Sequence, residues 1–165
     1  QGIEIGGSKY EKDKTELAKT ILEKAKQKKV EILLPVDHLT VQKVDENAAI
    51  KIEGPGISPG WLGVDIGPKT IELFKKTLSQ AHTVIWNGPM GIFEMKPFAK
   101  GSYEVAHQLS ELSDATTVIG GGDTAACVIG FGLADKMTHI STGGGASLEY
   151  LEGKEIPGIA ALENK

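Results

Sequence analysis

Three consecutive glycines, followed by an aspartate and a threonine, are the residues of this sequence whose types and spacing best suit phosphate chemistry. They come directly after the apolar run 116–119 and are Gly120, Gly121, Gly122, Asp123 and Thr124. Glycines let a phosphate approach the backbone without meeting a side chain, and free amides at a helix start carry partial positive charge. Asp123 could then hold a magnesium ion that bridges phosphate oxygens, and Thr124 could donate its hydroxyl or its amide.

The same segment fits two other interpretations. Aspartate is a favoured N-cap residue and glycine runs also form tight turns, so a purely structural role stays open. The segment also matches G-x-G-x-x-A, a dinucleotide-binding pattern, across Gly120, Gly122 and Ala125. That match is weak, because no acidic residue stands cleanly about 20 positions further on, where such folds place one. A Walker phosphate loop is not indicated, since residues 67–70 (Gly-Pro-Lys-Thr) lack its spacing.

Two further glycine-bearing segments leave apolar runs in a similar way. Residues 86–94 contain Glu94, which could accept hydrogen bonds from ribose hydroxyls, although a lone loop glutamate is more often simply solvated. Residues 141–146 form a second glycine-rich exit, for which an anion-binding surface and a hinge or turn are both open interpretations. If the preceding runs are strands of one parallel sheet, these segments lie at the same edge.

Other kinds of catalytic site are not indicated. The four histidines show no metal-ligand spacing, and no Ser/His/Asp set is evident. Cys127 is the only cysteine and follows the glycine turn on an expected helix. There, a small buried apolar filler is a better interpretation than a nucleophile.

The elements that must position these segments alternate between strands and helices. We expect strands over 30–35, 49–53, 83–86, 116–119 and 136–140, and helices over 9–29, 68–81, 97–112, from about 123, and 146–152. Glycine and proline clusters make the remainder of 36–63 hard to assign, apart from a loop near 54–60. Alternation of this kind is typical of an α/β fold, a parallel sheet covered by helices. Ligands of such sheets bind beyond the carboxyl ends of the strands, where the glycine segments lie.

Composition limits the class of protein and of partner. The chain has 165 residues, of which 40% are hydrophobic and 24% charged, the balance of a globular domain with its own core. A net charge of −4 argues against a nucleic-acid surface, and all 18 basic residues are lysines, so no arginine can grip a phosphate at two points. Acidic residues interleave with the lysines of 9–29, which favours a solvated helix face over a basic patch. The sequence has no membrane-length apolar run and no visible signal peptide, and its single cysteine suits a reducing, cytoplasmic compartment.

Five ordered segments resemble the phosphoglycerate kinase family, and the likeness runs over nearly the whole chain. They are residues 33–37, 60–68, 86–94, 119–125 and 140–149. The resemblance implies reversible phosphoryl transfer from 1,3-bisphosphoglycerate to ADP, giving 3-phosphoglycerate and ATP, with Mg²⁺ as the metal. It also implies that residues 1–165 belong to the carboxy-terminal, nucleotide-binding domain. That domain is expected to be Rossmann-like, three-layer α/β/α with a mainly parallel sheet.

By the same resemblance, three groups of residues form the nucleotide site. The expected nucleotide-binding residues are Leu62, Gly63, Val64, Asn87, Pro89, Glu94, Gly120, Gly121, Gly122, Asp123 and Thr124. The first three lie against the adenine, Glu94 takes the ribose hydroxyls, and the last four hold the phosphates, with Asp123 as the metal ligand. The expected catalytic residues are Gly121, Gly122 and Gly144, the last of these in a segment near the hinge and the transferring phosphate.

The resemblance also implies parts that are missing here. The family's amino-terminal domain, which carries 3-phosphoglycerate and a catalytic arginine, is absent, as is the first strand-helix segment of the nucleotide domain. The chain begins Gln1-Gly2-Ile3 without a Met, which is expected of a fragment or a processed product. We therefore expect an active, monomeric intact enzyme and an inactive isolated chain with exposed sheet edge and core. A non-catalytic nucleotide-binding module and a dinucleotide-dependent oxidoreductase are the rival functions.

Overall fold

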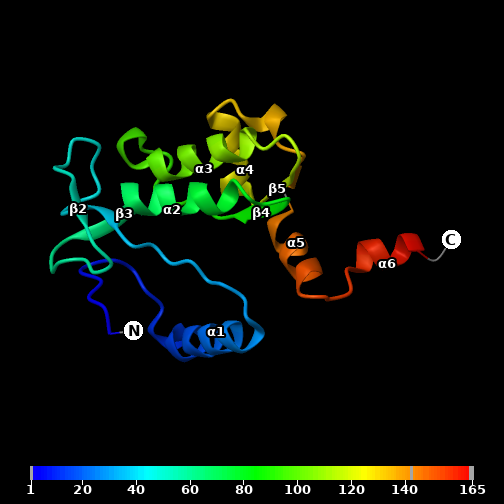
Figure 1. The fold of residues 1–165 in the computed structure, drawn as a ribbon, viewed down its shortest axis with the longest axis horizontal. Helices are drawn as coiled ribbons and strands as arrows, with labels where there is room; N and C mark the ends of the chain where they lie inside the picture. The colour runs from blue at the N-terminus through cyan, green and yellow to red at the C-terminus, as the bar shows by residue number, and fades with distance from the viewer. Residues whose placement is uncertain (1, 142, 164–165) are drawn as a thin grey trace. The chain divides into compact units, whose positions relative to one another are not determined.

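Two compact units make up the chain, Gln1–Phe74 and Lys75–Lys165, and each has its own three-stranded sheet. The computed structural model describes residues 2–141 and 143–163, and Figure 1 shows their helices and strands in chain order. Among the described residues, no helix has both the length and the apolar character needed to cross a bilayer.

The first unit is built on an antiparallel sheet of order β2-β1-β3. β1 (His38–Val41) pairs with β2 (Lys51–Glu53) on one side and with β3 (Leu62–Ile66) on the other. The strand predicted over 49–53 is confirmed in its second half. β1 and β3 were not predicted, because β1 is only four residues long and β3 carries a glycine and an aspartate, which strands disfavour.

Helix α1 of the first unit lies at the surface. The helix predicted over 9–29 is confirmed as a 3₁₀ turn, η1 (Lys12–Lys14), followed by α1 (Thr15–Lys28). The C-cap residue of α1 is Lys29, which takes a left-handed φ of 56°. None of its residues is buried, and the apolar side chains of Leu17 and Ile21 are 55% and 50% exposed. The amphipathic pattern therefore forms a helix whose apolar side chains stay half-buried or exposed.

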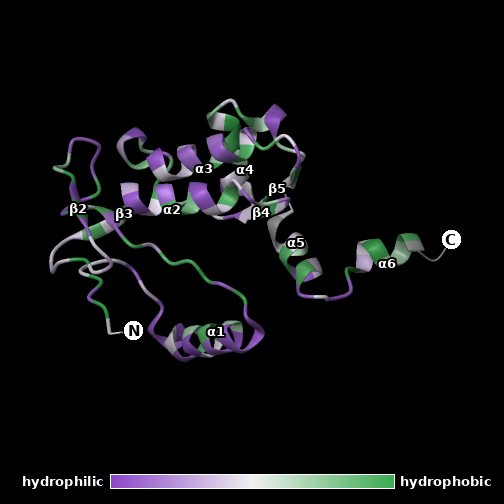
Figure 2. Cartoon of the chain, viewed as in Figure 1, coloured by the Kyte–Doolittle hydropathy of each residue, from purple (hydrophilic) through white to green (hydrophobic). Residues whose placement is uncertain are grey.

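The strand predicted over 30–35 is wrong, because this segment follows an irregular path. Its apolar side chains are largely in solvent; Val30 is 59% and Leu34 is 47% exposed. A strand needs a neighbouring strand to satisfy its backbone groups, and no strand of the described residues pairs with this segment. Figure 2 shows hydrophobic residues along this otherwise solvated stretch of the first unit.

The second unit is built on a parallel sheet of order β4-β5-β6. Its strands are β4 (Thr83–Asn87), β5 (Thr116–Gly120) and β6 (His139–Ser141). The strands predicted over 83–86 and 116–119 are confirmed. The strand predicted over 136–140 starts later, because a 3₁₀ turn, η3 (Ala134–Lys136), takes its first residue.

The helices also follow the predicted order. α2 (Pro68–Leu78) carries the boundary between the units, η2 (Lys96–Phe98) leads into α3 (Lys100–Ser110), and α4 (Gly122–Gly130) follows β5 directly. α5 (Gly144–Leu151) and α6 (Pro157–Glu163) complete the described chain, and α6 was not predicted. The α/β class with a parallel sheet flanked by helices is thus confirmed, and the antiparallel sheet of the first unit is an addition to it.

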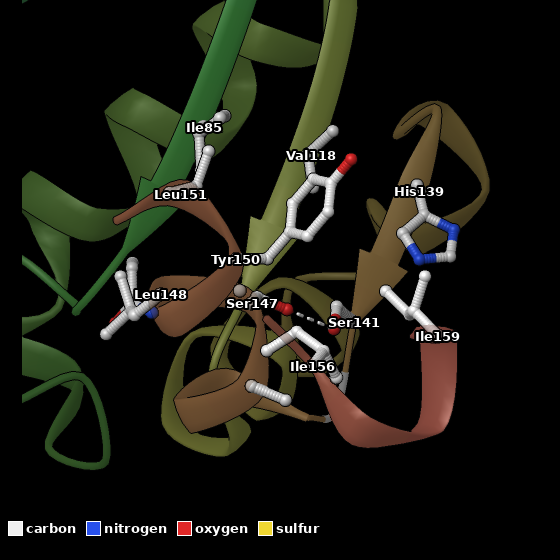
Figure 3. A pocket seen from close by; sticks show the side chains of 13 residues that line it. Ile85, Val118, His139, Ser141, Ser147, Leu148, Tyr150, Leu151, Ile156 and Ile159 are labelled. Carbon is white, nitrogen blue, oxygen red and sulfur yellow. Dashed lines mark hydrogen bonds between the residues drawn. The ribbon is translucent and has the colours of Figure 1, made fainter. Parts of the chain in front are cut away.

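The two faces of the parallel sheet differ. On one face, a core of buried side chains joins the strands to α3 and α4, and its members are Trp86, Val105, Ala106, Leu109, Ile119, Cys127, Val128 and Met137. On the other face, Ile85 and Val118 line an open pocket of about 310 Å³ together with residues of α5 and α6 (Figure 3). The packed face fixes the strand ends, and the candidate site lies at those ends.

Candidate functional site

The exits of the three parallel strands lie side by side, as the sequence predicted. Asn87 is the register partner of Gly120, and Gly120 is the register partner of Ser141. Because the strands are parallel, the segments that follow these residues leave from the same edge of the sheet. The three glycine-bearing segments identified by sequence therefore converge within the second unit.

The glycine turn after β5 is shaped by close approach to Asn87. A Cβ built on Gly120 would meet the Asn87 side-chain nitrogen at 3.3 Å, and one on Gly121 would meet the Asn87 oxygen at 3.4 Å. Gly121 also has a φ of +90°, a conformation that side chains other than glycine rarely adopt. A Cβ on Gly122 would meet nothing within 4 Å, so this residue opens onto free space. A ligand can approach the backbone here without meeting a side chain.

The first residues of α4 present unpaired amides at this opening. Gly121 is the N-cap and makes no side-chain cap hydrogen bond, while the N–H of Ala125 is the first to bond back, to the Gly121 carbonyl at 3.0 Å. Gly122 and Asp123 are exposed, and they precede the first intrahelical bond. Asp123 is therefore not the N-cap, and that structural interpretation of the aspartate is wrong. Amide donors together with the helix dipole favour an anion at this point.

Thr124 is placed differently from its two predecessors. It is 1% exposed, and its Oγ1 accepts the N–H of Gly88 at 2.8 Å. The hydroxyl is thus engaged inside the unit and is not presented to a ligand. Of the two donors predicted for Thr124, only the backbone amide is at the helix start.

The loop after β4 is held from several sides. The indole Nε1 of Trp86 donates to the Gly88 carbonyl at 2.7 Å, and the N–H of Met90 donates to Oγ of the fully buried Ser102 at 2.9 Å. Gly88 has a φ of +104°. Of the predicted residues in this loop, Asn87 and Glu94 are exposed and Pro89 is half-buried. Glu94 is therefore open to solvent on a backbone that is fixed by side chains of the core.

Cys127 lies beneath this loop in α4. It is 1% exposed, and burial raises the pKa of its thiol to about 11, with a hydrogen bond to Ser102 opposing the rise and the charge of Glu94 adding to it. A thiol with so high a pKa is protonated at neutral pH. The interpretation of Cys127 as a buried filler is confirmed.

The exit from β6 leads into α5. Gly143 is the N-cap of α5, and Gly144, a predicted catalytic residue, is its first residue. Ser141 Oγ and Ser147 Oγ lie 2.9 Å apart and share a hydrogen bond, drawn in Figure 3, which ties the strand end to the helix. Thr142, part of the predicted segment 141–145, lies outside the described residues. The second glycine-rich exit therefore also opens a helix, as the first one does.

The predicted adenine residues, Leu62, Gly63 and Val64, belong to β3 in the first unit. Gly63 is exposed, and its N–H donates to the Ser8 hydroxyl at 3.0 Å. A Cβ on Gly63 would lie 2.9 Å from the terminal methyl of Ile57, which would have to shift to admit a side chain. Val64 is 4% exposed and packs in the core of the unit, so only its backbone is left to contact a ligand.

A buried carboxylate that the sequence interpretation did not single out orders the end of this strand. Asp37 is 3% exposed; its carboxylate accepts the amides of Lys69 at 2.9 Å and of Thr70 at 2.8 Å, and the Thr70 hydroxyl at 2.6 Å. Burial raises the pKa of Asp37, but these hydrogen bonds and the charge of Lys69 outweigh it, so the pKa is lowered. A Cβ on Gly67 would collide with this carboxylate. In the sequence, the feature that could have pointed to Asp37 was Gly67 directly before Pro68. This pair begins a helix at a place where the backbone passes close to the Asp37 carboxylate.

A second carboxylate fixes the loop that precedes β3. Glu53 accepts hydrogen bonds from Lys51 Nζ at 2.8 Å, from Thr40 Oγ1 at 3.2 Å, and from the backbone and hydroxyl of Ser58. The hydrogen bonds from Lys51 and Ser58 lower the pKa of Glu53 to about 2. Lys51 Nζ also lies 5.1 Å from the centre of the Trp61 ring, one residue before Leu62. Polar contacts therefore help to hold this loop, together with the buried side chain of Ile57.

A magnesium ion fits the site only as a partner of phosphate. Among the described residues, no group of three His, Cys, Asp or Glu side chains could hold a metal by itself. Asp123 is a single exposed carboxylate beside the helix start. Mg²⁺ is commonly bound by one or two carboxylates together with substrate phosphates, so this donor set suits a metal carried by a nucleotide.

Comparison with known proteins was made for sequence and for structure. The family model described as phosphoglycerate kinase matches residues 1–154. Phosphoglycerate kinases of Lactobacillus delbrueckii subsp. lactis and Clostridium tetani are 57% and 58% identical to the whole of this chain. The chain spans only 40% and 41% of the length of these two relatives.

The structural neighbours agree with the sequence relatives. The structure of phosphoglycerate kinase from Coxiella burnetii aligns with a TM-score of 0.89 at 37% identity, over 93% of this chain and 40% of that one. That of Pyrococcus horikoshii OT3 aligns with a TM-score of 0.71 at 31% identity, over 98% of this chain and 41% of that one. These neighbours confirm the Rossmann-like fold class. The family match over nearly the whole chain and the identities of its relatives lead to one conclusion: the chain belongs to the phosphoglycerate kinase family.

Proposed function

We propose that this chain supplies the MgADP/MgATP site of a phosphoglycerate kinase, which transfers a phosphoryl group between 1,3-bisphosphoglycerate and ADP. The observation that carries the proposal is the set of unpaired amides at the start of α4, opening onto free space at Gly122. Oriented amides of this kind neutralise phosphate charge without reorganising, which is what phosphoryl transfer requires of a protein. Membership of the family supplies the substrate class.

Each part of the site has a role in this proposal. The amides of Gly121, Gly122, Asp123 and Thr124 hold the phosphates, and the carboxylate of Asp123 binds the magnesium ion. Magnesium, when bound, neutralises phosphate oxygens during transfer. Glu94 accepts the ribose hydroxyls, with Asn87 and Pro89 along the same loop, and Leu62, Gly63 and Val64 contact the adenine. Gly121, Gly122 and Gly144 act at the transferring phosphate.

The proposal makes residues 1–165 the carboxy-terminal domain of a cytoplasmic, monomeric enzyme. No arginine occurs in the chain, and Glu94 and Asp123 add negative charge near a polyanion. The remaining positive charge must then come from a second domain, which carries 3-phosphoglycerate. The short span of the chain on its relatives supports this division of labour. The isolated chain is accordingly proposed to bind nucleotide and not to turn it over.

Calorimetric titration of the chain with MgADP, and separately with NADH, tests the function. Saturable MgADP binding with no NADH binding is expected, and NADH binding alone would favour the oxidoreductase. Asp123→Asn should reduce the dependence of ADP affinity on magnesium, whereas unchanged dependence would contradict the metal role. An assay with 3-phosphoglycerate and MgATP should show no turnover by the chain alone. Turnover would contradict the need for a second domain.

A further inference from the structure

One side chain joins two of the converging strand exits. Thr124 is the third residue of α4, so its amide belongs to the helix start that faces the opening after β5. Its hydroxyl reaches the loop after β4 and accepts the Gly88 N–H at 2.8 Å, across 36 positions of sequence. The backbone and side chain of this one residue therefore serve different segments of the site.

The Gly88 peptide is held at both of its polar atoms. Its N–H donates to Thr124, and its carbonyl accepts the Trp86 indole at 2.7 Å. Gly88 has a φ of +104°, a backbone conformation that glycine adopts readily and other residues rarely adopt. The loop begun at this turn leads to Glu94. The direction in which the loop leaves the sheet thus depends on a hydrogen bond to α4.

Two other roles for the Thr124 hydroxyl do not fit the structure. A residue that is 1% exposed cannot offer its side chain to a bound phosphate. The N-cap of α4 is Gly121, and no side chain caps this helix, so Thr124 does not serve as a cap either. What remains is a connection between the loop and the helix.

We propose that Thr124 is a positioning residue. Its hydroxyl fixes the loop 88–94 to the start of α4 by a hydrogen bond. The loop proposed to bind ribose and the helix start proposed to bind phosphate therefore keep a constant position relative to each other. The proposal rests on the proposed function, because the two segments are those assigned to ribose and phosphate. A nucleotide that spans both segments binds more tightly when they are already in register, since less freedom is lost on binding.

Two substitutions separate the hydroxyl from the rest of the side chain. Thr124→Val keeps the shape and branching of the residue but removes the acceptor, leaving the Gly88 N–H without a partner. Thr124→Ser keeps the hydroxyl and removes a methyl group, and it is the matched control. Loss of one buried hydrogen bond corresponds to a change of about 3- to 10-fold.

The experiment measures two quantities in the 165-residue chain: amide hydrogen exchange at Gly88 and affinity for MgADP. In the valine variant, Gly88 exchange should become faster and ADP binding weaker, each by about 3- to 10-fold. Trp86 emission should shift as well, because its indole bonds the same peptide. The serine variant should keep wild-type Gly88 exchange and Trp86 emission, and it should bind ADP more tightly than the valine variant does. In the wild-type chain, MgADP should leave the Gly88 amide protected.

The possible results differ clearly. Faster Gly88 exchange with unchanged ADP affinity in the valine variant would show that the hydrogen bond holds the loop without affecting nucleotide binding, and would overturn the proposal. Unchanged Gly88 exchange in the valine variant would show that the hydrogen bond to Thr124 does not hold this amide, and would also overturn the proposal. If the valine variant does not fold, loss of Gly88 protection when wild-type chain binds MgADP would mean that the hydroxyl leaves the loop, which also overturns it. A wild-type chain that binds no ADP would end the proposed function, while Gly88 exchange would still report on the hydrogen bond to Thr124.

Discussion

The loops of the two units are held in place by different kinds of interaction. In the second unit, a parallel sheet and a continuous apolar core hold the strand ends, and the glycine turn follows a strand whose residue Ile119 is fully buried. In the first unit, hydrogen bonds to two carboxylates, Asp37 and Glu53, hold the segments on either side of β3. Its helix α1 buries no residue.

This difference bears on the relative stability of the two units. Apolar burial stabilises in proportion to the area removed from water, whereas a hydrogen bond makes a small net contribution unless it is broken on one side only. We therefore expect the second unit to be the more stable of the two. The exposed apolar side chains of 30–36 and α1 should lower the stability of the first unit.

Each unit carries its own reporters for testing this expectation. Trp61 belongs to the first unit, and Trp86 and the buried Cys127 belong to the second. Single-tryptophan variants, made by replacing one tryptophan at a time with phenylalanine, allow each unit to be followed separately. Alkylation of Cys127 gives a second measure for the second unit, since a buried thiol reacts only when the unit opens.

The largest expected effect comes from the core of the second unit. Leu109 is 1% exposed, and Leu109→Ala should lower the free energy of unfolding of this unit by about 2–5 kcal/mol, because it leaves a cavity. Leu17→Ala in α1 is the matched control, since Leu17 is 55% exposed and should change stability within about 0.5 kcal/mol. Denaturant titration followed by Trp86 emission and Cys127 alkylation measures the first variant, and titration followed by Trp61 emission measures the control. Equal losses in the two variants would remove the contrast between the units.

Replacing the buried carboxylate of the first unit should be the next largest effect. Asp37→Asn removes the charge that accepts three hydrogen bonds from Lys69 and Thr70, and about 2–3 kcal/mol of stability should be lost. Trp61 emission should report the loss, while Cys127 alkylation should stay at the wild-type rate. Loss confined to the second unit would show that Asp37 does not stabilise the unit that contains it.

A third substitution probes the glycine turn. Gly121→Ala places a Cβ at a φ of +90° and beside Asn87, which should strain the second unit by about 1–3 kcal/mol. The variant should also bind MgADP more weakly, because the amides after Gly121 would change direction. Gly122→Ala is the control for stability, since a Cβ there meets nothing within 4 Å. If both variants unfold alike, the turn does not depend on the conformation of Gly121.

Acid should act on the first unit before the second. The pKa of Asp37 is lowered by its hydrogen bonds, and that of Glu53 is lowered to about 2. A carboxylate with a lowered folded-state pKa stabilises above its unfolded pKa, and that stability is lost as pH falls through the folded value. Between about pH 4 and pH 2, Trp61 emission should therefore change before Trp86 emission. The reverse order would contradict the role given to the two carboxylates.

The sequence predicted those features of the site that depend on local patterns. Apolar runs followed by glycines predicted β4, β5 and the start of α4, and the parallel sheet predicted that their exits converge. The site residues keep their predicted positions in these segments, and their roles stay predictions. What local patterns could not predict was pairing between distant residues. Thr124 bonds Gly88 across 36 positions, and Asp37 bonds Thr70 across 33.

The segment 30–35 shows that a local pattern can also predict a strand where the described residues hold no pairing partner. Its composition favours a strand, but a strand exists only where another strand pairs with it, and the described residues provide none. Composition sets what a segment can form, and the neighbours decide whether it does. The short β1 is the converse case, because pairing with both β2 and β3 makes a strand of a weak local pattern.

The most direct test of the central claim is a nuclear magnetic resonance titration of the ¹⁵N-labelled chain with MgADP. If backbone donors at the start of α4 hold the phosphates, the largest amide shifts should fall on Gly121, Gly122, Asp123 and Thr124. Smaller shifts should follow along residues 87–94. Shifts confined to the opposite edge of the sheet, near Ser79 and Asp114, with none at 121–124, would contradict the account.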